Sequence, residues 1–285
     1  MVWCVGGVCG RWGLQLWADP AVLSEVLTRK YDKLEQWMHA NKLVINPDKT
    51  HLMVMGSKKH TAARKAVTII ASGHIIKPTV TEKLLGGQLH QSLDWNFHLR
   101  DHEGSLMKQL TGRINGLRRV CFNASFQTKL KVANGVVMSK LSYLITLWGG
   151  AQQYLLSALQ VQQMTAARAV CGFRGWGWSR KRLLDKVGWL SVRQLIFYHT
   201  TLQTIKTINT GKPMDLYQAI TSDYPYQTRS ATSGQIRQDE TLKRTSFKYR
   251  AREAYNQVPA HVRTGSLATV KKKLKQWVKT NIPID

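Results

Sequence analysis

The chain has 285 residues, 43% of them hydrophobic, which is enough for one large domain or two or three small ones with packed cores. Its 42 lysine and arginine residues exceed its 16 aspartate and glutamate residues, and the resulting net charge of +26 favours a polyanionic partner. No apolar run approaches the roughly 20 residues of a membrane-spanning helix, and no basic region typical of a signal peptide opens the chain. Four scattered cysteines are too few for a disulfide framework. We therefore expect an intracellular protein, nuclear or cytoplasmic, that is neither secreted nor bound to a membrane.

The first predicted helix has about 20 residues, from Asp19 to near Asn41. Asp19 can cap the first turn, and Pro20 suits the first helical position because its missing N–H would have no partner there. Apolar residues recur at three- and four-residue spacing and are expected to face the core: Leu23, Leu27, Tyr31, Leu34, Trp37 and Met38.

Short strands are predicted after this helix. Leu43–Ile45 and Thr50–Met55 are expected to pair as a hairpin across a turn at Asn46–Lys49, in which proline and local side-chain hydrogen bonds favour the reversal. Residues 66–89 are expected to form further short strands that are broken by Gly73 and Pro78, with Gly86 and Gly87 at a turn or bulge.

From Asp94 the apolar spacing becomes helical and predicts an antiparallel bundle. One helix face is expected to carry Leu99, Leu106, Leu110, Ile114 and Leu117, and the next Leu130, Ala133, Val137, Leu141, Leu144 and Leu147. Further helices are predicted at 154–170, 179–187 and 191–208. Residues 221–243 are polar and predict a surface linker. The last predicted helix, 266–281, has two faces: Leu267, Val270, Leu274, Trp277 and Val278 inward, and Lys271, Lys272, Lys273, Lys275 and Lys279 outward.

The bundle coincides with a long acid-free segment. Residues 104–184 include 12 lysine and arginine residues and no aspartate or glutamate. A basic helical surface of this kind is typical of a protein that follows a phosphate backbone, although a generally basic surface or attraction to a membrane remains an alternative. The candidate nucleic-acid-binding residues are Lys108, Arg113, Arg118, Arg119, Lys129, Lys131, Arg174, Arg180, Lys181 and Arg182.

Several short motifs follow one another in a fixed order. "LEQWMHANKLVINPDKTHLMVMG" contains a tryptophan near the end of a helix and then the turn pattern Asn-x-Leu-x-Ile-Asn-x-x-Lys-Thr. "EKLLGGQLHQSLDWNFHL", "VVMSKLSYLITLWGG", "QQMTAARAVCG" and "GWLSVRQLIFYHTTLQTIK" come next. This succession resembles the C-terminal part of reverse transcriptases of non-LTR (LINE-like, jockey-type) retrotransposons.

The resemblance implies an α+β, mainly α fold with a β-hairpin remnant and a helical bundle. It divides the chain into a degenerate stretch at 1–18, a partial palm at 19–93, a thumb-like bundle at 94–220, a linker at 221–243 and a basic helical tail at 244–285. The family copies RNA into DNA with two Mg²⁺ ions, which are held by an aspartate from an earlier palm strand and two from a Tyr-x-Asp-Asp hairpin. That earlier strand and the fingers would precede Met1.

The sequence lacks the carboxylates of that hairpin. Trp17-Ala18-Asp19-Pro20 has lost one of the two aspartates, and by the family's spacing the hairpin belongs around residues 4–10, where "CVGGVCG" has none. We therefore expect no metal site and no cofactor in this chain. By resemblance, Lys49 corresponds to a lysine that protonates or neutralises leaving pyrophosphate, and an ordinary surface lysine is the alternative.

Other groups of residues have two interpretations each. In "GFRGWGW", Arg174, Trp176 and Trp178 could stack on bases, but burial of the tryptophans in the bundle is favoured. His98 and His102 lack a third metal ligand, which favours packing or solvent-exposed roles. The run Lys271–Lys273 fits a nuclear localisation signal, a phosphate contact or a solvated helix face equally.

Three hypotheses follow from the sequence. The first is a truncated, catalytically inactive RNA-directed DNA polymerase fragment. The second is a non-catalytic module that binds an RNA template or an RNA–DNA hybrid. The third is a chain without a stable fold, because an unpaired hairpin is only marginally stable. The oligomeric state is not predicted.

Overall fold

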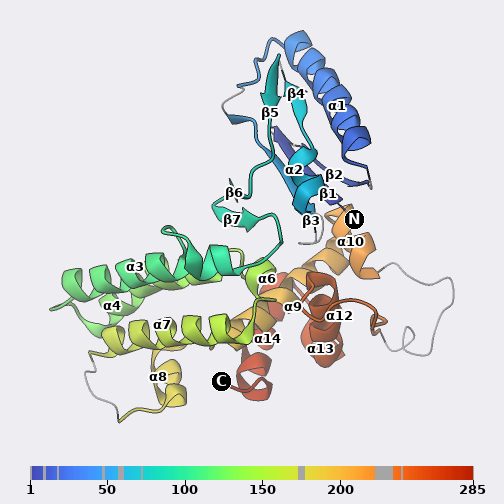
Figure 1. The fold of residues 1–285 in the computed structure, drawn as a ribbon. Helices are drawn as coiled ribbons and strands as arrows, with labels where there is room; N and C mark the ends of the chain where they lie inside the picture. The colour runs from blue at the N-terminus through green and yellow to red at the C-terminus, as the bar shows by residue number, and fades with distance from the viewer. Residues whose placement is uncertain are drawn as a thin grey trace. The chain divides into compact units, whose positions relative to one another are not determined.

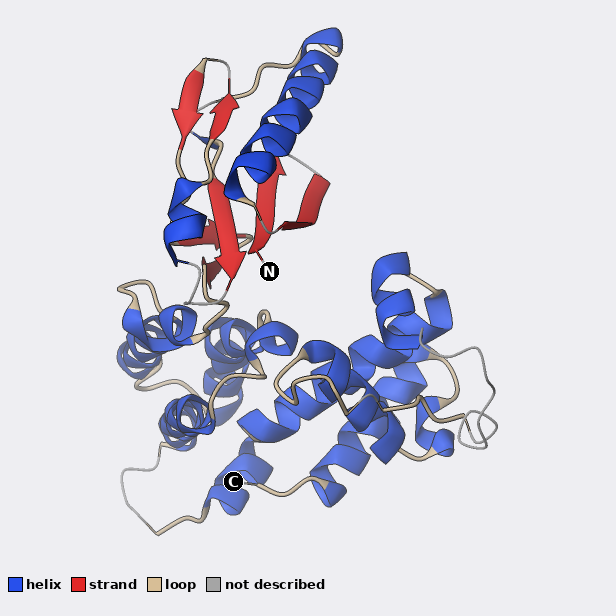
Figure 2. Cartoon of the chain, turned by 45° about the vertical axis from the view of Figure 1, so that its right-hand side comes forward, coloured by secondary structure: helices blue, strands red, loops and turns tan. Residues whose placement is uncertain are grey.

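The computed structural model describes residues 2–8, 11–17, 19–46, 49–56, 61–71, 73–172, 177–221, 234–238 and 240–284, with residues 2–8, 11–17 and Gly56 described as backbone alone. The chain divides into two compact units, Met1–Ser105 and Leu106–Asp285. Among the described residues, strands occur in the first unit and the second unit is helical, as the colouring in Figure 2 shows. The predicted α+β, mainly α fold class is therefore confirmed.

The first unit is built around a three-stranded antiparallel sheet. Its order is β2 (Arg11–Trp17), β1 (Val2–Val8), β3 (Leu52–Gly56), with Val8 opposite Arg11 and Gly6 opposite Leu52. The predicted pairing of β3 with residues 43–45 is wrong, because β3 pairs with β1 over its whole length and residues 43–45 form no strand. Between them, the Lys49 N–H donates to the Asn46 carbonyl at 3.2 Å, and Pro47 and Asp48 of the predicted turn lie outside the described residues.

The apolar face of helix α1 (Pro20–Ala40) packs against residues of the strands in this unit. The Asp19 carboxylate accepts from the Ala21 N–H at 2.8 Å, so the predicted cap is confirmed. Five of the six predicted core residues of α1 pack against strand residues: Leu23, Leu27, Tyr31, Leu34 and Met38. Trp37 was predicted to join them but is 58% exposed, because it lies at the border of the apolar stripe.

The remaining elements of this unit are short. They are α2 (Thr61–Ala66), the hairpin β4 (Ile69–Ala71) and β5 (His74–Ile76), the hairpin β6 (Thr81–Leu84) and β7 (Gly87–His90), and the π-helical turn η3 (Phe97–Asp101). The predicted short strands are thus present. Leu85 and Gly86 connect β6 to β7 with φ of 46° and 80°, and two successive positive φ angles are typical of a type I′ hairpin turn.

The second unit contains α3 (Leu106–Val120), α4 (Phe126–Ala133), η4 (Asn134–Met138), α5 (Ser139–Ser142), α6 (Ile145–Trp148), α7 (Gln153–Cys171), α8 (Arg180–Val187), α9 (Val192–Thr210), α10 (Met214–Thr221), α12 (Phe247–Gln257), α13 (Ala260–Arg263) and α14 (Leu267–Asn281). Helices α3, α4 and α7 lie side by side, and α12 and α14 pack on α9 (Figure 1). Among the described helices, five begin at a serine whose hydroxyl accepts from the N–H three residues later: Ser125, Ser179, Ser191, Ser246 and Ser266.

The predicted core of α3 is confirmed, but the predicted helix begins too early. Leu106, Leu110, Ile114 and Leu117 are buried. Leu99 is buried too, but in η3, and the extended residue His102 separates η3 from α3. The His102 side chain accepts from the Gly104 N–H at 2.8 Å, and this local bond replaces a helical one.

The second predicted helix is interrupted. Leu144 has a left-handed φ of 55°, which ends the run of α4, η4 and α5 and turns the chain into α6. The interruption buries Ile145 and Trp148, and the Trp148 indole N–H donates to the Tyr143 carbonyl at 2.9 Å. Leu147, which was predicted to face inward, is therefore exposed.

The C-terminal helices belong to the same compact unit as the bundle. In α14, Val270, Leu274 and Val278 are buried and Leu267 is exposed, contrary to its predicted place, because it lies in the first turn of the helix. The five predicted outward lysines are exposed: Lys271, Lys272, Lys273, Lys275 and Lys279.

Part of the predicted linker packs onto α12. Residues 222–233 and 239 lie outside the described residues, but residues 234–238 are held by hydrogen bonds to this helix. The Ile236 N–H donates to Asn256 Oδ1 at 2.8 Å, and Gln238 Nε2 donates to the Tyr249 carbonyl at 3.2 Å. These five residues are therefore part of the folded unit.

Candidate nucleic-acid interface

A cavity of about 530 Å³ lies in the helical unit at the end of α3, the start of α4 and the end of α7. Its described lining includes three cations and no carboxylate. The lining residues are Leu117, Arg118, Cys121, Phe122, Lys129, Arg168, Ala169 and Gly172.

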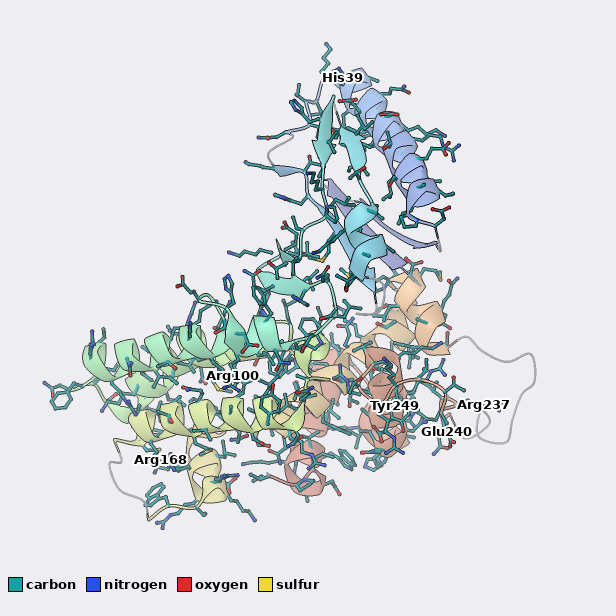
Figure 3. The ribbon with its side chains drawn as sticks, viewed as in Figure 1. His39, Arg100, Arg168, Arg237, Glu240 and Tyr249 are labelled. Atoms are coloured by element: carbon teal, nitrogen blue, oxygen red, sulfur yellow. The ribbon has the colours of Figure 1, made fainter. Side chains whose placement is uncertain are left out.

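Three helix ends place the cations around this cavity. Arg118 follows the buried Leu117 in the last turn of α3. Lys129 lies one turn into α4, which starts where the Ser125 hydroxyl accepts from the Thr128 N–H at 3.2 Å. Arg168, labelled in Figure 3, lies in the last turn of α7, which ends at Gly172 with a left-handed φ of 67°. The positive charges therefore come from segments that are far apart in the sequence.

The cavity also has an apolar part. Leu117 and Cys121 are buried. Phe122 lies in the turn between α3 and α4 and is 65% exposed. An exposed aromatic ring beside cations is an arrangement suited to contact with both the bases and the phosphates of a single strand.

The other predicted residues on α3 and α4 are not gathered at the cavity. Lys108 and Arg119 share the outer face of α3, and Lys131 is exposed on α4. Arg113 Nη1 donates to the Val136 carbonyl at 2.9 Å, so this side chain holds α3 to η4. Of the ten predicted residues, Arg118 and Lys129 line the cavity.

The sequence interpretation missed Arg168 as a site residue. Arg168 lies in the acid-free segment, but the nearest basic residues in the sequence are Lys140 and Arg174, so the sequence gives no sign of a neighbouring basic cluster. Only the packing of α7 against α3 and α4 brings it to Arg118 and Lys129.

A second basic group occupies the first turn of α8. Arg180, Lys181 and Arg182 are exposed there, and Ser179 caps the helix. The N-terminal end of a helix carries a partial positive charge that repels positive side chains placed there. An anion bound at this end would reduce the repulsion. Arg182 lies over the Trp178 ring at 4.3 Å, and Trp178 is partly buried. Arg174 and Trp176 lie outside the described residues.

Positive side chains outnumber negative ones near the end of α7 and along α8. Burial raises the pKa of the Cys171 thiol, while the positive charge of Lys186 acts in the opposite direction. Asp185, the first acidic residue after the acid-free segment, accepts from Lys279 Nζ at 2.8 Å. This carboxylate therefore has a partner on α14.

The first unit places Lys49 on an exposed turn. The backbones of residues 2–8 and 11–17 pair as antiparallel strands, and Cys4–Gly7 lies in the first of them, β1. His98 Nδ1 accepts from the Gln88 N–H at 3.2 Å, so this buried histidine contributes to packing. Within the described ranges, no group of three or more His, Cys, Asp or Glu residues could hold a metal ion. No described helix has the length and apolar character needed to cross a membrane.

Comparisons with protein-family models, curated proteins and solved structures found no match to this chain. A role for the candidate interface must therefore be inferred from the chain's own residues. The residues with the most specific arrangement are Arg118, Lys129 and Arg168 around one cavity.

Proposed function

We propose that this chain is a catalytically inactive fragment of a reverse transcriptase that binds nucleic acid through its helical unit. The observation that carries the proposal is the convergence of Arg118, Lys129 and Arg168 from three helices on a cavity whose described lining has no carboxylate. Cations that converge on one cavity repel one another, and a phosphate backbone supplies the opposite charge.

The family part of the proposal rests on the motifs in the sequence. Two features of the first unit support it: the antiparallel strands β1 and β2 before the capped helix α1, and the hydrogen bond from Lys49 to Asn46 after it. Inactivity follows from the residue types, because residues 4–10, where the family's hairpin is expected, contain no aspartate or glutamate. Without carboxylates at the hairpin, two Mg²⁺ ions would lack their ligands, and Lys49 would have no polymerisation step to serve.

Binding is expected to weaken steeply with salt. If the three cavity cations and Arg180, Lys181 and Arg182 each neutralise a phosphate, raising the salt from roughly 50 to 200 mM should weaken binding about 10³-fold. Fluorescence anisotropy with a labelled RNA–DNA hybrid would measure this change. An affinity that is insensitive to salt would contradict the proposal.

A matched pair of triple variants would locate the interface. Arg118→Gln, Lys129→Gln and Arg168→Gln together should reduce the slope of log affinity against log salt by about 2.7, because about 0.9 is lost per phosphate contact. Lys271→Gln, Lys272→Gln and Lys275→Gln remove the same charge from the exposed face of α14. The slope should change much less in this control, and equal changes in the two variants would exclude the cavity as the main contact.

Primer extension is expected to be absent. The purified chain, incubated with an annealed RNA template, a DNA primer, deoxynucleotides and Mg²⁺, should extend no primer, because the hairpin region has no metal-binding carboxylate. An active reverse transcriptase in the same buffer is the positive control. Primer extension that survives further purification would refute catalytic inactivity while leaving the binding proposal intact.

A further inference from the structure

The cavity at Arg118, Lys129 and Arg168 is more than a basic patch. Its volume of about 530 Å³ lies within the range of about 300–1,000 Å³ that is typical of pockets for small organic ligands. The phosphates of a regular duplex contact cations on a surface without filling a recess. A recess of this size therefore suggests a group that enters it.

Two kinds of surface meet in this recess. Leu117, Cys121 and Phe122 are apolar, whereas Arg118 and Lys129 are cationic. An inorganic phosphate would use the cations alone, and an apolar peptide would leave them without counter-charges. A nucleotide carries both complementary parts, a flat base and an anionic phosphate.

Phe122 is the lining residue suited to contact a base rather than a phosphate. Its ring is 65% exposed in the turn that connects α3 to α4, where it borders the cavity. Aromatic side chains at such positions stack on unpaired bases, whose faces are covered by neighbouring bases in a duplex. The ring would therefore contribute to binding of a single strand and little to binding of a duplex.

We propose that this cavity receives the base of an unpaired nucleotide, with Phe122 stacking on the base and Arg118, Lys129 and Arg168 contacting the adjoining phosphates. The proposal rests on the nucleic-acid binding proposed above and adds a preference for single strands. The shared chemistry of the ligand is an unpaired base with its flanking phosphates.

The test compares two single strands of equal charge. An oligothymidylate of about 12 nucleotides and an abasic strand of the same length carry the same phosphates, but only the first has bases. The protein should bind the oligothymidylate about tenfold more tightly than the abasic strand, and also more tightly than the RNA–DNA hybrid of that length. Equal affinity for the oligothymidylate and the abasic strand would overturn the proposal.

Two variants assign the effect to the cavity. Phe122→Ala should remove the preference for bases while leaving the affinity for the abasic strand unchanged. Trp37→Ala removes a comparably exposed ring, 58% exposed, from the first unit and should keep the preference. Thermal unfolding would verify that both variants fold. A preference that survives Phe122→Ala would also overturn the proposal.

Photocrosslinking supplies an independent readout. An oligothymidylate with one 5-bromodeoxyuridine should give adducts within residues 117–122, and adducts confined to other segments would contradict the assignment. Salt-sensitive binding that ignores the bases would refute this inference alone. If none of the probes showed salt-sensitive binding, the proposed function would be refuted as well.

Discussion

Replacement of Arg252 by leucine is expected to destabilise the helical unit by about 3 kcal/mol or more, because each buried carbonyl left without a partner costs about 1–3 kcal/mol. Arg252 is 2% exposed and donates to three carbonyls. Nε bonds the Ile220 carbonyl at 3.0 Å, Nη1 the Arg237 carbonyl at 3.1 Å, and Nη2 the Ala219 carbonyl at 3.3 Å. Ala219 and Ile220 lie at the C-terminal end of α10, where carbonyls lack helical partners and carry partial negative charge.

Urea unfolding followed by circular dichroism would measure this loss. Arg252→Lys should give an intermediate loss, because one ammonium group cannot reproduce the planar fork of donors that reaches three carbonyls. Arg244→Leu, an exposed position just before α12, is the control and should change the free energy of unfolding by less than about 0.5 kcal/mol. Similar stability of Arg252→Leu and the control would show that the three hydrogen bonds do not hold the segment.

Replacement of Gly150 by alanine is expected to destabilise the same unit by about 1–3 kcal/mol through overpacking. A Cβ at this position would overlap the backbone carbonyl of Thr245 and would approach Arg250 Nε to 3.3 Å. Neither neighbour can yield easily. The carbonyl oxygen of Thr245 accepts from Arg250 Nε, and Arg250 Nη2 also donates to the Thr146 carbonyl at 2.8 Å. The close packing buries Arg250 and lowers its pKa to about 10, which leaves it charged at neutral pH.

Gly112 offers a control of opposite sign. It lies in the interior of α3, and a Cβ there would meet no atom within 4 Å. Gly112→Ala should therefore stabilise the chain by about 0.5–1 kcal/mol, because alanine loses less backbone entropy in a helix. The midpoints of thermal unfolding of the two variants should shift in opposite directions. A Gly150→Ala variant as stable as the parent would mean that the start of α12 adapts readily.

Much of the local structure could be predicted from the residues. Asp19 and Pro20 predict the start of α1, and the apolar spacing of Leu106, Leu110 and Ile114 predicts the buried face of α3. These features depend on hydrogen bonds and side-chain contacts within a few residues, so a linear pattern contains them. The candidate residues Arg118 and Lys129 were identified for a similar reason, because the acid-free composition of their segment is visible without a structure.

The wrong predictions concern strand pairing and burial that depend on segments far apart in the sequence. Thr50–Met55 had a near neighbour at residues 43–45, but the strand that pairs with β3 is β1, nearly 50 residues earlier in the chain. Leu144 gave no sign of the left-handed turn that exposes Leu147 and buries Trp148. Composition likewise could not separate cations that bind ligands from cations that support the fold, such as Arg252.

By itself, the sequence determined the strong positive charge, the absence of carboxylates at residues 4–10 and the helical character of most of the chain. These properties are sums over residue types or local periodicities, and no packing is needed to obtain them. Only the tertiary structure decided which cations meet. Arg118, Lys129 and Arg168 surround one cavity because the ends of α3 and α7 and the start of α4 pack together, and contacts between such distant helices depend on the shape of the whole core.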